Sequence, residues 1–134
     1  MIYFISGHRD ITPEDFQTYY APIIYNALMN DRNAYFVVGD CEGVDSMAQD
    51  FLKELGAEHV TVYHMLESPR YLATPKFSTQ GGYKSDVERD TAMTEASNKD
   101  IAFIGKGRWT SGTAQNILRR YERDMRKRTN ERRS

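Results

Sequence analysis

The sequence predicts an α/β domain of three layers, in which helices flank a mostly parallel sheet. Four short apolar runs are typical of strands that are buried on both faces of a sheet. They lie at residues 2–5, 34–38, 59–64 and 101–104. Patterns with helical spacing alternate with these runs, as in parallel βαβ units. We expect the strand order 3-2-1-4, in which the chain reverses direction between the first and the fourth strand.

The first strand leads through a polar turn into a helix that begins after Thr12. Thr12 suits the N-cap position, and Pro13 suits the first helical position because its missing N–H is not needed there. Apolar residues then recur with helical spacing. Pro22 interrupts this pattern, so a kink or a break is predicted near Ala21.

Residues 37–48 combine the end of the second strand, a glycine-bounded turn and the start of a helix. One apolar stripe with helical spacing supports that helix: Val44, Met47, Ala48, Phe51, Leu52 and Leu55. Such a turn directs backbone N–H groups and the positive end of the helix dipole above the strand, which suits a phosphate group. The alternative is a plain strand-to-helix connection, in which glycine only eases the turn.

The second half of the chain contains a long segment with few structural signals. Residues 66–83 include two prolines and two adjacent glycines, and we expect a loop that is either functional, as a lid or binding loop, or mobile. A third helix is predicted over residues 84–97. The last helix is predicted to begin at Ala114, after a turn rich in glycine and hydroxyl groups at residues 105–113.

Three polar turns, at residues 6–10, 39–45 and 105–113, follow three of the predicted strands. The carboxyl ends of parallel strands meet at one edge of a sheet, and ligands bind where the strand order reverses. We therefore expect these turns to converge on a crevice that holds a small phosphorylated ligand.

The composition is that of one globular domain. The chain has 134 residues, 40% of them apolar, which is enough for a substantial core. An apolar run long enough to cross a membrane is absent, and the N-terminus lacks the pattern of a secretory signal. The single cysteine, Cys41, cannot form an internal disulfide, which fits a cytoplasmic location. The aromatic residues, nine Tyr and six Phe, could serve the core or an interface, and a homodimer is our default expectation.

The basic residues are concentrated at the C-terminus. Residues 119–134 carry eight Arg or Lys and three Asp or Glu, whereas the whole chain has a net charge of −1. A basic tail can contact nucleic acid. We favour the alternative, a solvated helix end whose cations suit the C-terminal dipole, because residues 1–118 show no matching basic patch.

Three motifs, taken in order, resemble the SLOG superfamily, a Rossmann-like group that includes the Lonely-guy phosphoribohydrolases and the DNA-processing protein A fold. The motifs are Ser6-Gly7-His8-Arg9, the block from Gly39 to Ala48, and Glu88-Arg89-Asp90 followed by Ser111-Gly112-Thr113. The match spans most of residues 2–118 and leaves residues 66–83 unmatched. Residues 1–118 would then form a nucleotide-binding domain, with residues 119–134 as a basic C-terminal helix end.

The resemblance implies that a nucleotide or a nucleotide-derived molecule binds in the crevice. Gly112 and Thr113 would then contact a phosphate, and Arg9 would contact a phosphate or a ribose. Arg89 corresponds to the arginine of the Lonely-guy active site, and Glu88 is the neighbouring catalytic candidate; a surface ion pair is the alternative for Arg89. Together with the turn analysis this gives the candidate ligand-binding set Ser6, Gly7, His8, Arg9, Gly39, Asp40, Gly43, Asp45, Gly105, Trp109, Ser111, Gly112 and Thr113.

One departure from the family pattern bears directly on catalysis. The phosphoribohydrolases have a glutamate two positions after the threonine of the Gly-Thr turn, and this chain has Gln115 there. An amide cannot exchange a proton near neutral pH. We therefore expect a binding module, such as a sensor or a sequestering protein. The alternatives are an N-glycosidase that uses another carboxylate (Glu88, Asp86, Glu42 or Asp40) and a nucleic-acid-binding protein.

Four single residues have two interpretations each. His8 could bind phosphate or be an ordinary turn residue. Cys41 lies near a helix N-terminus, where a thiol pKa is lowered, but no base for a nucleophile is evident. Trp109 could stack on a base or pack on the last helix, and Asp45 could cap its helix or contact a ribose hydroxyl.

No metal site or cofactor is expected. His59 and His64 flank one strand at an odd spacing, so they point to opposite faces. No further His or Cys cluster joins them.

Overall fold

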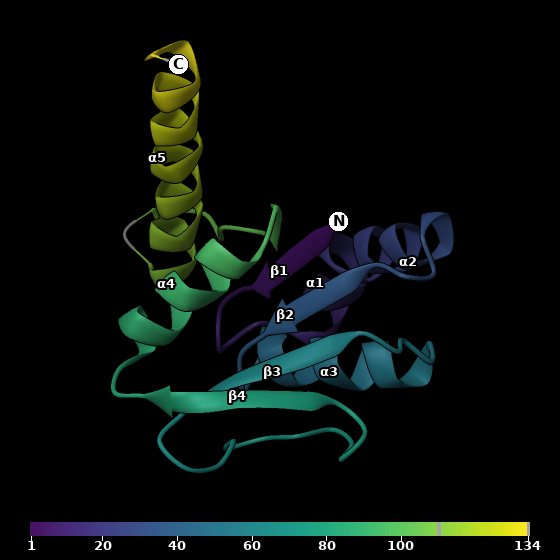
Figure 1. The fold of residues 1–134 in the computed structure, drawn as a ribbon. Coiled ribbons are helices and arrows are strands. Elements are labelled where there is room, and N and C mark those ends of the chain that lie inside the picture. Colours follow the sequence, from purple (N-terminus) through teal and green to yellow (C-terminus); the bar gives the residue numbers. More distant parts are fainter. Residues whose placement is uncertain (110, 134) are drawn as a thin grey trace.

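The computed structural model describes residues 1–109 and 111–133. It forms one five-stranded sheet in which every strand pair is parallel, with the order β4-β3-β2-β1-β5 (Figure 1). The strands are β1 (Ile2–Ser6), β2 (Tyr35–Val38), β3 (Val60–Met65), β4 (Ser78–Tyr83) and β5 (Lys99–Ala102). The helices are α1 (Pro13–Tyr19), α2 (Ala21–Asn30), α3 (Val44–Glu54), α4 (Asp86–Ala96) and α5 (Gly112–Arg133).

The predicted α/β fold is confirmed, with one additional strand. The four predicted strands correspond to β1, β2, β3 and β5, and they adopt the expected relative order. The predicted loop at residues 66–83 is wrong in its second half, because residues 78–83 form the edge strand β4 along β3. The sequence Ser-Thr-Gln-Gly-Gly-Tyr is polar and largely exposed, so this strand lacks the apolar run that marks the buried ones.

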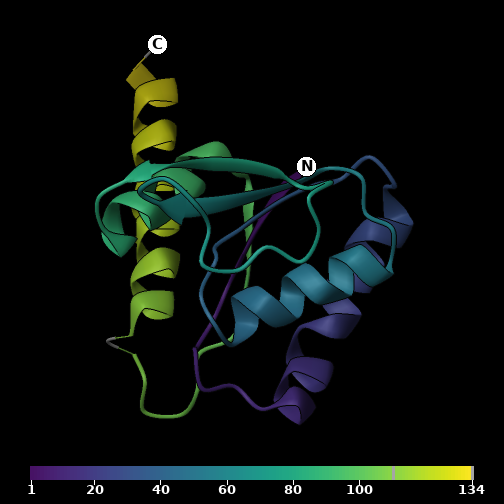
Figure 2. The same ribbon diagram turned by 90° about the horizontal axis from the view of Figure 1, so that it is seen from below.

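Helices cover both faces of the sheet (Figures 1 and 2). Alternate strand residues, among them Ile5, Phe36 and Val38, enter the larger core cluster beneath α1, α2 and α3. Phe4 and Val37 point to the opposite face and pack with Met93 of α4. This alternation is the period of two that a strand imposes on its side chains, and it completes the three predicted layers.

The predicted break near Ala21 is confirmed. α1 ends at Tyr19 and α2 begins at Ala21, with Pro22 in its first turn. Tyr20 lies between them, and its side chain is buried. Its hydroxyl donates a hydrogen bond to the Ser6 carbonyl at 2.8 Å and accepts one from the Phe103 N–H at 2.9 Å. The Tyr20 hydroxyl therefore connects the end of β1 to the residue that follows β5. Two of the predicted ligand-binding turns begin at these strand ends.

The last helix begins two residues before Ala114 and continues through the basic segment. Its C-terminal end projects beyond the body of the domain (Figure 1). The expectation of a purely solvated helix end is wrong for Arg120 and Arg123, which are buried. Both donate to the carbonyl oxygens of Thr94 and Ser97 at the C-terminal end of α4, where a positive charge also favours the helix dipole. These bonds hold α5 against α4.

Within the described ranges, no helix is both long and apolar enough to cross a membrane.

Candidate functional site

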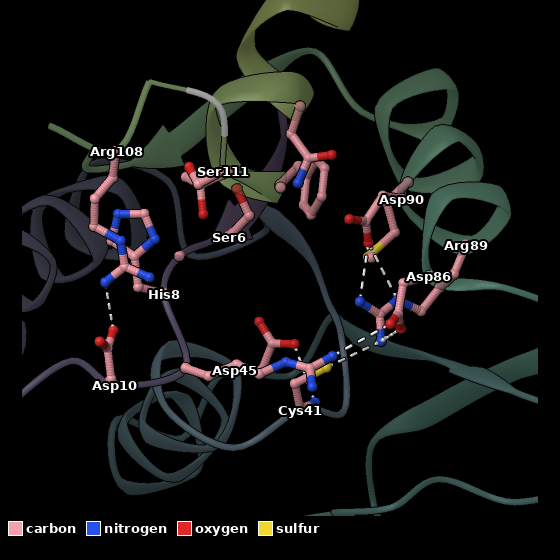
Figure 3. A pocket seen from close by; sticks show the side chains of 17 residues that line it. Ser6, His8, Asp10, Cys41, Asp45, Asp86, Arg89, Asp90, Arg108 and Ser111 are labelled. Carbon is pink, nitrogen blue, oxygen red and sulfur yellow. Dashed lines mark hydrogen bonds and ion pairs between the residues drawn. The ribbon is translucent and has the colours of Figure 1, made fainter. Parts of the chain in front are cut away.

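A cleft of about 420 Å³ opens at the carboxyl end of the sheet, between the turn after β1, the start of α3, α4 and the first turn of α5 (Figure 3). The turns after β1, β2 and β5 all contribute to it, as predicted. Nine candidate residues line it: Ser6, Gly7, His8, Arg9, Asp45, Arg89, Ser111, Gly112 and Thr113. In Figure 3, Ser6 and Ser111 lie on one side of the cleft, and Arg89 lies on the other with Asp86 and Asp90.

Two predicted glycines, Gly39 and Gly43, lie outside the cleft and shape its floor. Gly43 has φ +84°, and a Cβ there would lie 2.5 Å from the Arg9 Cα. A Cβ on Gly39 would collide with the Asp45 carboxylate. Glycine is therefore needed at both positions because backbones and buried side chains approach closely. No phosphate contact is needed to explain either residue.

Gly105, Trp109 and Glu88 also lie outside the lining of the cleft. The Gly105 N–H donates to His8 Nε2 at 3.0 Å, which fastens the loop after β5 to the turn after β1. Trp109 is 73% exposed, so neither packing against the last helix nor a contact in the cleft is observed. Glu88 accepts from the Lys84 N–H, and its own N–H donates to Ser85 Oγ. Ser85 is the N-cap of α4, and both bonds hold Glu88 at the start of this helix.

The first turn of α5 forms one wall of the cleft. The Ser111 hydroxyl accepts the Ala114 N–H at 3.2 Å, as an N-cap does. The first N–H groups of a helix have no acceptor within the helix, and Gly112 and Thr113, the first two residues of α5, line the cleft. Beside them lies Ser6, which is 6% exposed and whose Oγ has no hydrogen-bond partner in the described part of the chain. A buried hydroxyl without a partner is costly, and a ligand oxygen would satisfy it.

His8 and Arg108 line the same side of the cleft. Burial and the neighbouring Arg108 guanidinium lower the pKa of His8, and its Nε2 accepts the Gly105 N–H. His8 is therefore neutral and carries its proton on Nδ1. Arg108 donates to Asp10 at 2.6 Å. The helix N-terminus and hydroxyl groups are thus better placed than a histidinium to hold an anion here.

Arg89 is the centre of a buried ion cluster. It is 5% exposed, and it donates to Asp40 Oδ1 at 2.8 Å and to Asp90 Oδ1 at 3.0 and 3.2 Å. Its predicted alternative, a weak surface ion pair, is wrong, because both partners are largely buried. Most of the guanidinium donors are used by the protein itself, so Arg89 holds the carboxylates of the cleft in place.

Asp45 lies at the bottom of the cleft with an unusual protonation equilibrium. Its Oδ2 accepts the Cys41 N–H at 3.1 Å, so it closes the turn before α3. The predicted capping role is wrong: Gly43 is the N-cap, and it makes no side-chain cap. Burial raises the pKa of Asp45 to about 7, although the Arg89 charge opposes this shift. A carboxyl group with such a pKa can give or take a proton near neutral pH.

Cys41 does not have the reactive environment expected near a helix N-terminus. It is buried, and its Sγ accepts hydrogen bonds from Arg70 at 3.2 Å and Arg89 at 3.4 Å. Burial raises the pKa of the thiol despite these cations. The thiol form therefore dominates at neutral pH.

Several lining residues were not in the predicted set: Phe4, Asp10, Cys41, Asp86, Asp90, Met93, Arg108 and Asn116. Asn116 differs from the prediction by one position: the motif resemblance directed attention to its neighbour Gln115, which is exposed. The helical phase of α5 turns residues 113 and 116 toward α4 and the cleft. Residues three apart lie on one face of a helix, so the spacing between Thr113 and Asn116 could have indicated that both face the cleft.

Asp40 lies outside this cleft and lines an adjacent cavity of about 480 Å³. It is 1% exposed and accepts three hydrogen bonds from Arg70, through the backbone N–H, Nε and NH2. These bonds hold the pKa of Asp40 below its ordinary value, although burial opposes the shift. Asp40 therefore acts as an ionised anchor for Arg70 and Arg89.

Comparisons with protein-family models, with curated proteins and with solved structures find no match to this chain. Among the described residues, no group of three or more His, Cys, Asp or Glu side chains could hold a metal ion.

Proposed function

We propose that this cleft binds a nucleotide or a related phosphorylated small molecule, with the phosphate at the first turn of α5. The observation that carries the proposal is the unpartnered, buried hydroxyl of Ser6 beside the N–H groups of Gly112 and Thr113. A helix N-terminus favours an anion through its dipole and its free N–H groups. The hydroxyl adds a donor that has no other acceptor nearby.

The buried inner wall of the cleft suits the nucleoside part. Phe4 and Met93 give it an apolar floor, and Asp90 and Asn116 bring polar groups to it. Few polar groups on an apolar surface are typical of small-molecule sites. The order of the three motifs that resemble the SLOG superfamily supports a nucleotide as the ligand class.

Replacing Ser6 by alanine should weaken the binding of a nucleoside monophosphate about tenfold, because a hydrogen bond to a charged oxygen is lost. Binding of the same nucleoside without phosphate should not change. Isothermal titration of both ligands against the wild type and Ser6→Ala measures this difference. Ser78→Ala, on the exposed edge strand, is the matched control.

Gly112→Val gives a second test of the phosphate position. A Cβ on Gly112 meets no protein atom within 4 Å, so the variant should fold normally. The valine side chain should obstruct the binding of a phosphate at the first turn of α5. Equal affinities for phosphorylated and unphosphorylated nucleosides in the wild type would rule out this phosphate site.

A second candidate function is hydrolysis of an N-glycosidic bond, and the carboxyl group of Asp45 favours it. This group lines the cleft, and its pKa of about 7 suits general acid–base catalysis. Release of free base from nucleoside monophosphates should then occur in the wild type and fall at least 100-fold in Asp45→Asn. Ligand recovered intact after prolonged incubation would leave binding alone.

A further inference from the structure

The carboxylate of Asp86 is shared by three arginines that come from different parts of the chain. Its Oδ2 accepts from Arg9 NH2 at 3.2 Å, and its Oδ1 lies 3.3 Å from Arg70 NH2 and 3.4 Å from Arg89 NH1. Guanidinium groups bind phosphate with the same geometry that they use for carboxylate. The place that Asp86 fills is therefore also suited to a phosphate group.

We propose that Arg9, Arg70 and Arg89 form a second anion site, from which a second phosphate of the ligand displaces Asp86. This inference rests on the proposed function, because it extends the ligand that binds at α5. It makes a nucleoside diphosphate the preferred ligand class over a monophosphate.

Asp86 can leave this place at little cost. Its side chain is 43% exposed, and those of Arg9 and Arg70 are 55% and 42% exposed. Ion pairs between side chains at such exposure contribute little to stability, and only the third partner, Arg89, is buried. Asp86 is the first residue of α4, whose cap is supplied by Ser85, so the helix does not need the Asp86 side chain for its start.

Two of the three arginines, Arg70 and Arg89, remain in position without Asp86, whereas the hydrogen bond of Arg9 is to Asp86 itself. Arg70 keeps three hydrogen bonds to Asp40, and Arg89 keeps its bonds to Asp40 and Asp90. Without Asp86, the three guanidinium groups would share two hydrogen-bonded carboxylates, those of Asp40 and Asp90, so the donors now bonded to Asp86 become free for an incoming anion. The ion pairs with Asp40 and Asp90 thus preorganise the site. The exposed carboxylate of Asp86 occupies the place where an anion would bind.

The location connects this second site to the first. Arg9 lines both the main cleft and the adjacent cavity; of these two, Arg89 lines the main cleft and Arg70 the adjacent cavity. A ligand held at the first turn of α5 can therefore extend toward the boundary between the two. We expect its second phosphate at this boundary.

Asp86→Asn is a test in which the substitution should strengthen binding. Removal of the competing carboxylate should tighten the binding of ADP and of inorganic pyrophosphate about tenfold, whereas the affinity for AMP should change less than about twofold. Arg70→Ala should weaken ADP and leave AMP unchanged. Calorimetric titration of the three ligands against each purified variant measures these ratios.

Glu95→Gln is the control for a general change in charge, because it removes an exposed, ion-paired carboxylate from the last turns of α4. It should leave the ratio of ADP to AMP affinity unchanged. If Asp86→Asn weakens ADP or leaves that ratio as in the wild type, the second site is wrong. If AMP does not bind while pyrophosphate responds as expected, the proposed nucleotide function fails and the second anion site stands.

Discussion

Replacing Arg89 by methionine should destabilise the folded protein by about 3–5 kcal/mol, the cost of removing one partner from a buried ion cluster. Methionine preserves much of the apolar length of the side chain. The buried carboxylate of Asp90 loses its main cationic partner, and Asp40 keeps only Arg70. Chemical denaturation near neutral pH measures this loss directly.

The expected loss is much smaller for an exposed pair. Arg108→Met breaks the contact with Asp10 at the mouth of the cleft, where both side chains are largely in water. That change should leave the denaturation midpoint close to that of the wild type, because exposed ion pairs contribute little to stability. Similar stabilities for Arg89→Met and Arg108→Met would show that the Arg89 cluster does not stabilise the fold.

This expectation changes how Arg89 can be tested for function. The motif resemblance implies a catalytic arginine, and Arg89→Ala is the obvious variant. A loss of binding or turnover in that variant would be ambiguous, because Asp90 and Asp45 would also lose the charge that holds them. Ser6 and Gly112 are cleaner probes, since neither side chain carries a charge.

The sheet was predictable where strands are buried on both faces. β1, β2 and β3 carry apolar runs whose side chains enter the core clusters on both faces of the sheet, whereas β5 is the other edge strand and its Ile101 is its one buried residue. β4 was not predicted because it is an edge strand with polar residues and two glycines. Its pairing with β3 is a long-range property that no local pattern within residues 78–83 expresses.

The position of the cleft was predictable from topology, but its electrostatics were not. Three turns after parallel strands had to converge at one edge, and they do so around the cleft. The ion cluster joins Asp40 after β2, Arg70 in the β3–β4 connection and Arg89 on α4. Charged residues at such separations show no periodicity that would link them. Only the folded arrangement turns them into one network.

Replacing Asp45 by asparagine should stabilise the protein at neutral and alkaline pH. The folded-state pKa of about 7 lies above the ordinary value of 3.8. Between these values the folded protein binds more protons than the unfolded chain, so stability falls as the pH rises and becomes level above about pH 7. The shift corresponds to about 4 kcal/mol at most. Asparagine mimics the neutral carboxyl group and can still accept the Cys41 N–H.

The variant and the wild type should therefore have similar stabilities near pH 4 and diverge by about 2–4 kcal/mol near pH 8, as measured by denaturation at each pH. Asp31→Asn, at the exposed end of α2, should retain the wild-type profile. A destabilised Asp45→Asn at high pH would show that the ionised carboxylate is well compensated by Arg89. A stabilised variant would mean that the native aspartate lowers stability at the bottom of the cleft. Proteins retain destabilising residues where activity needs them. If Asp45→Asn also abolishes the release of free base from nucleoside monophosphates, that release is the activity for which Asp45 is retained.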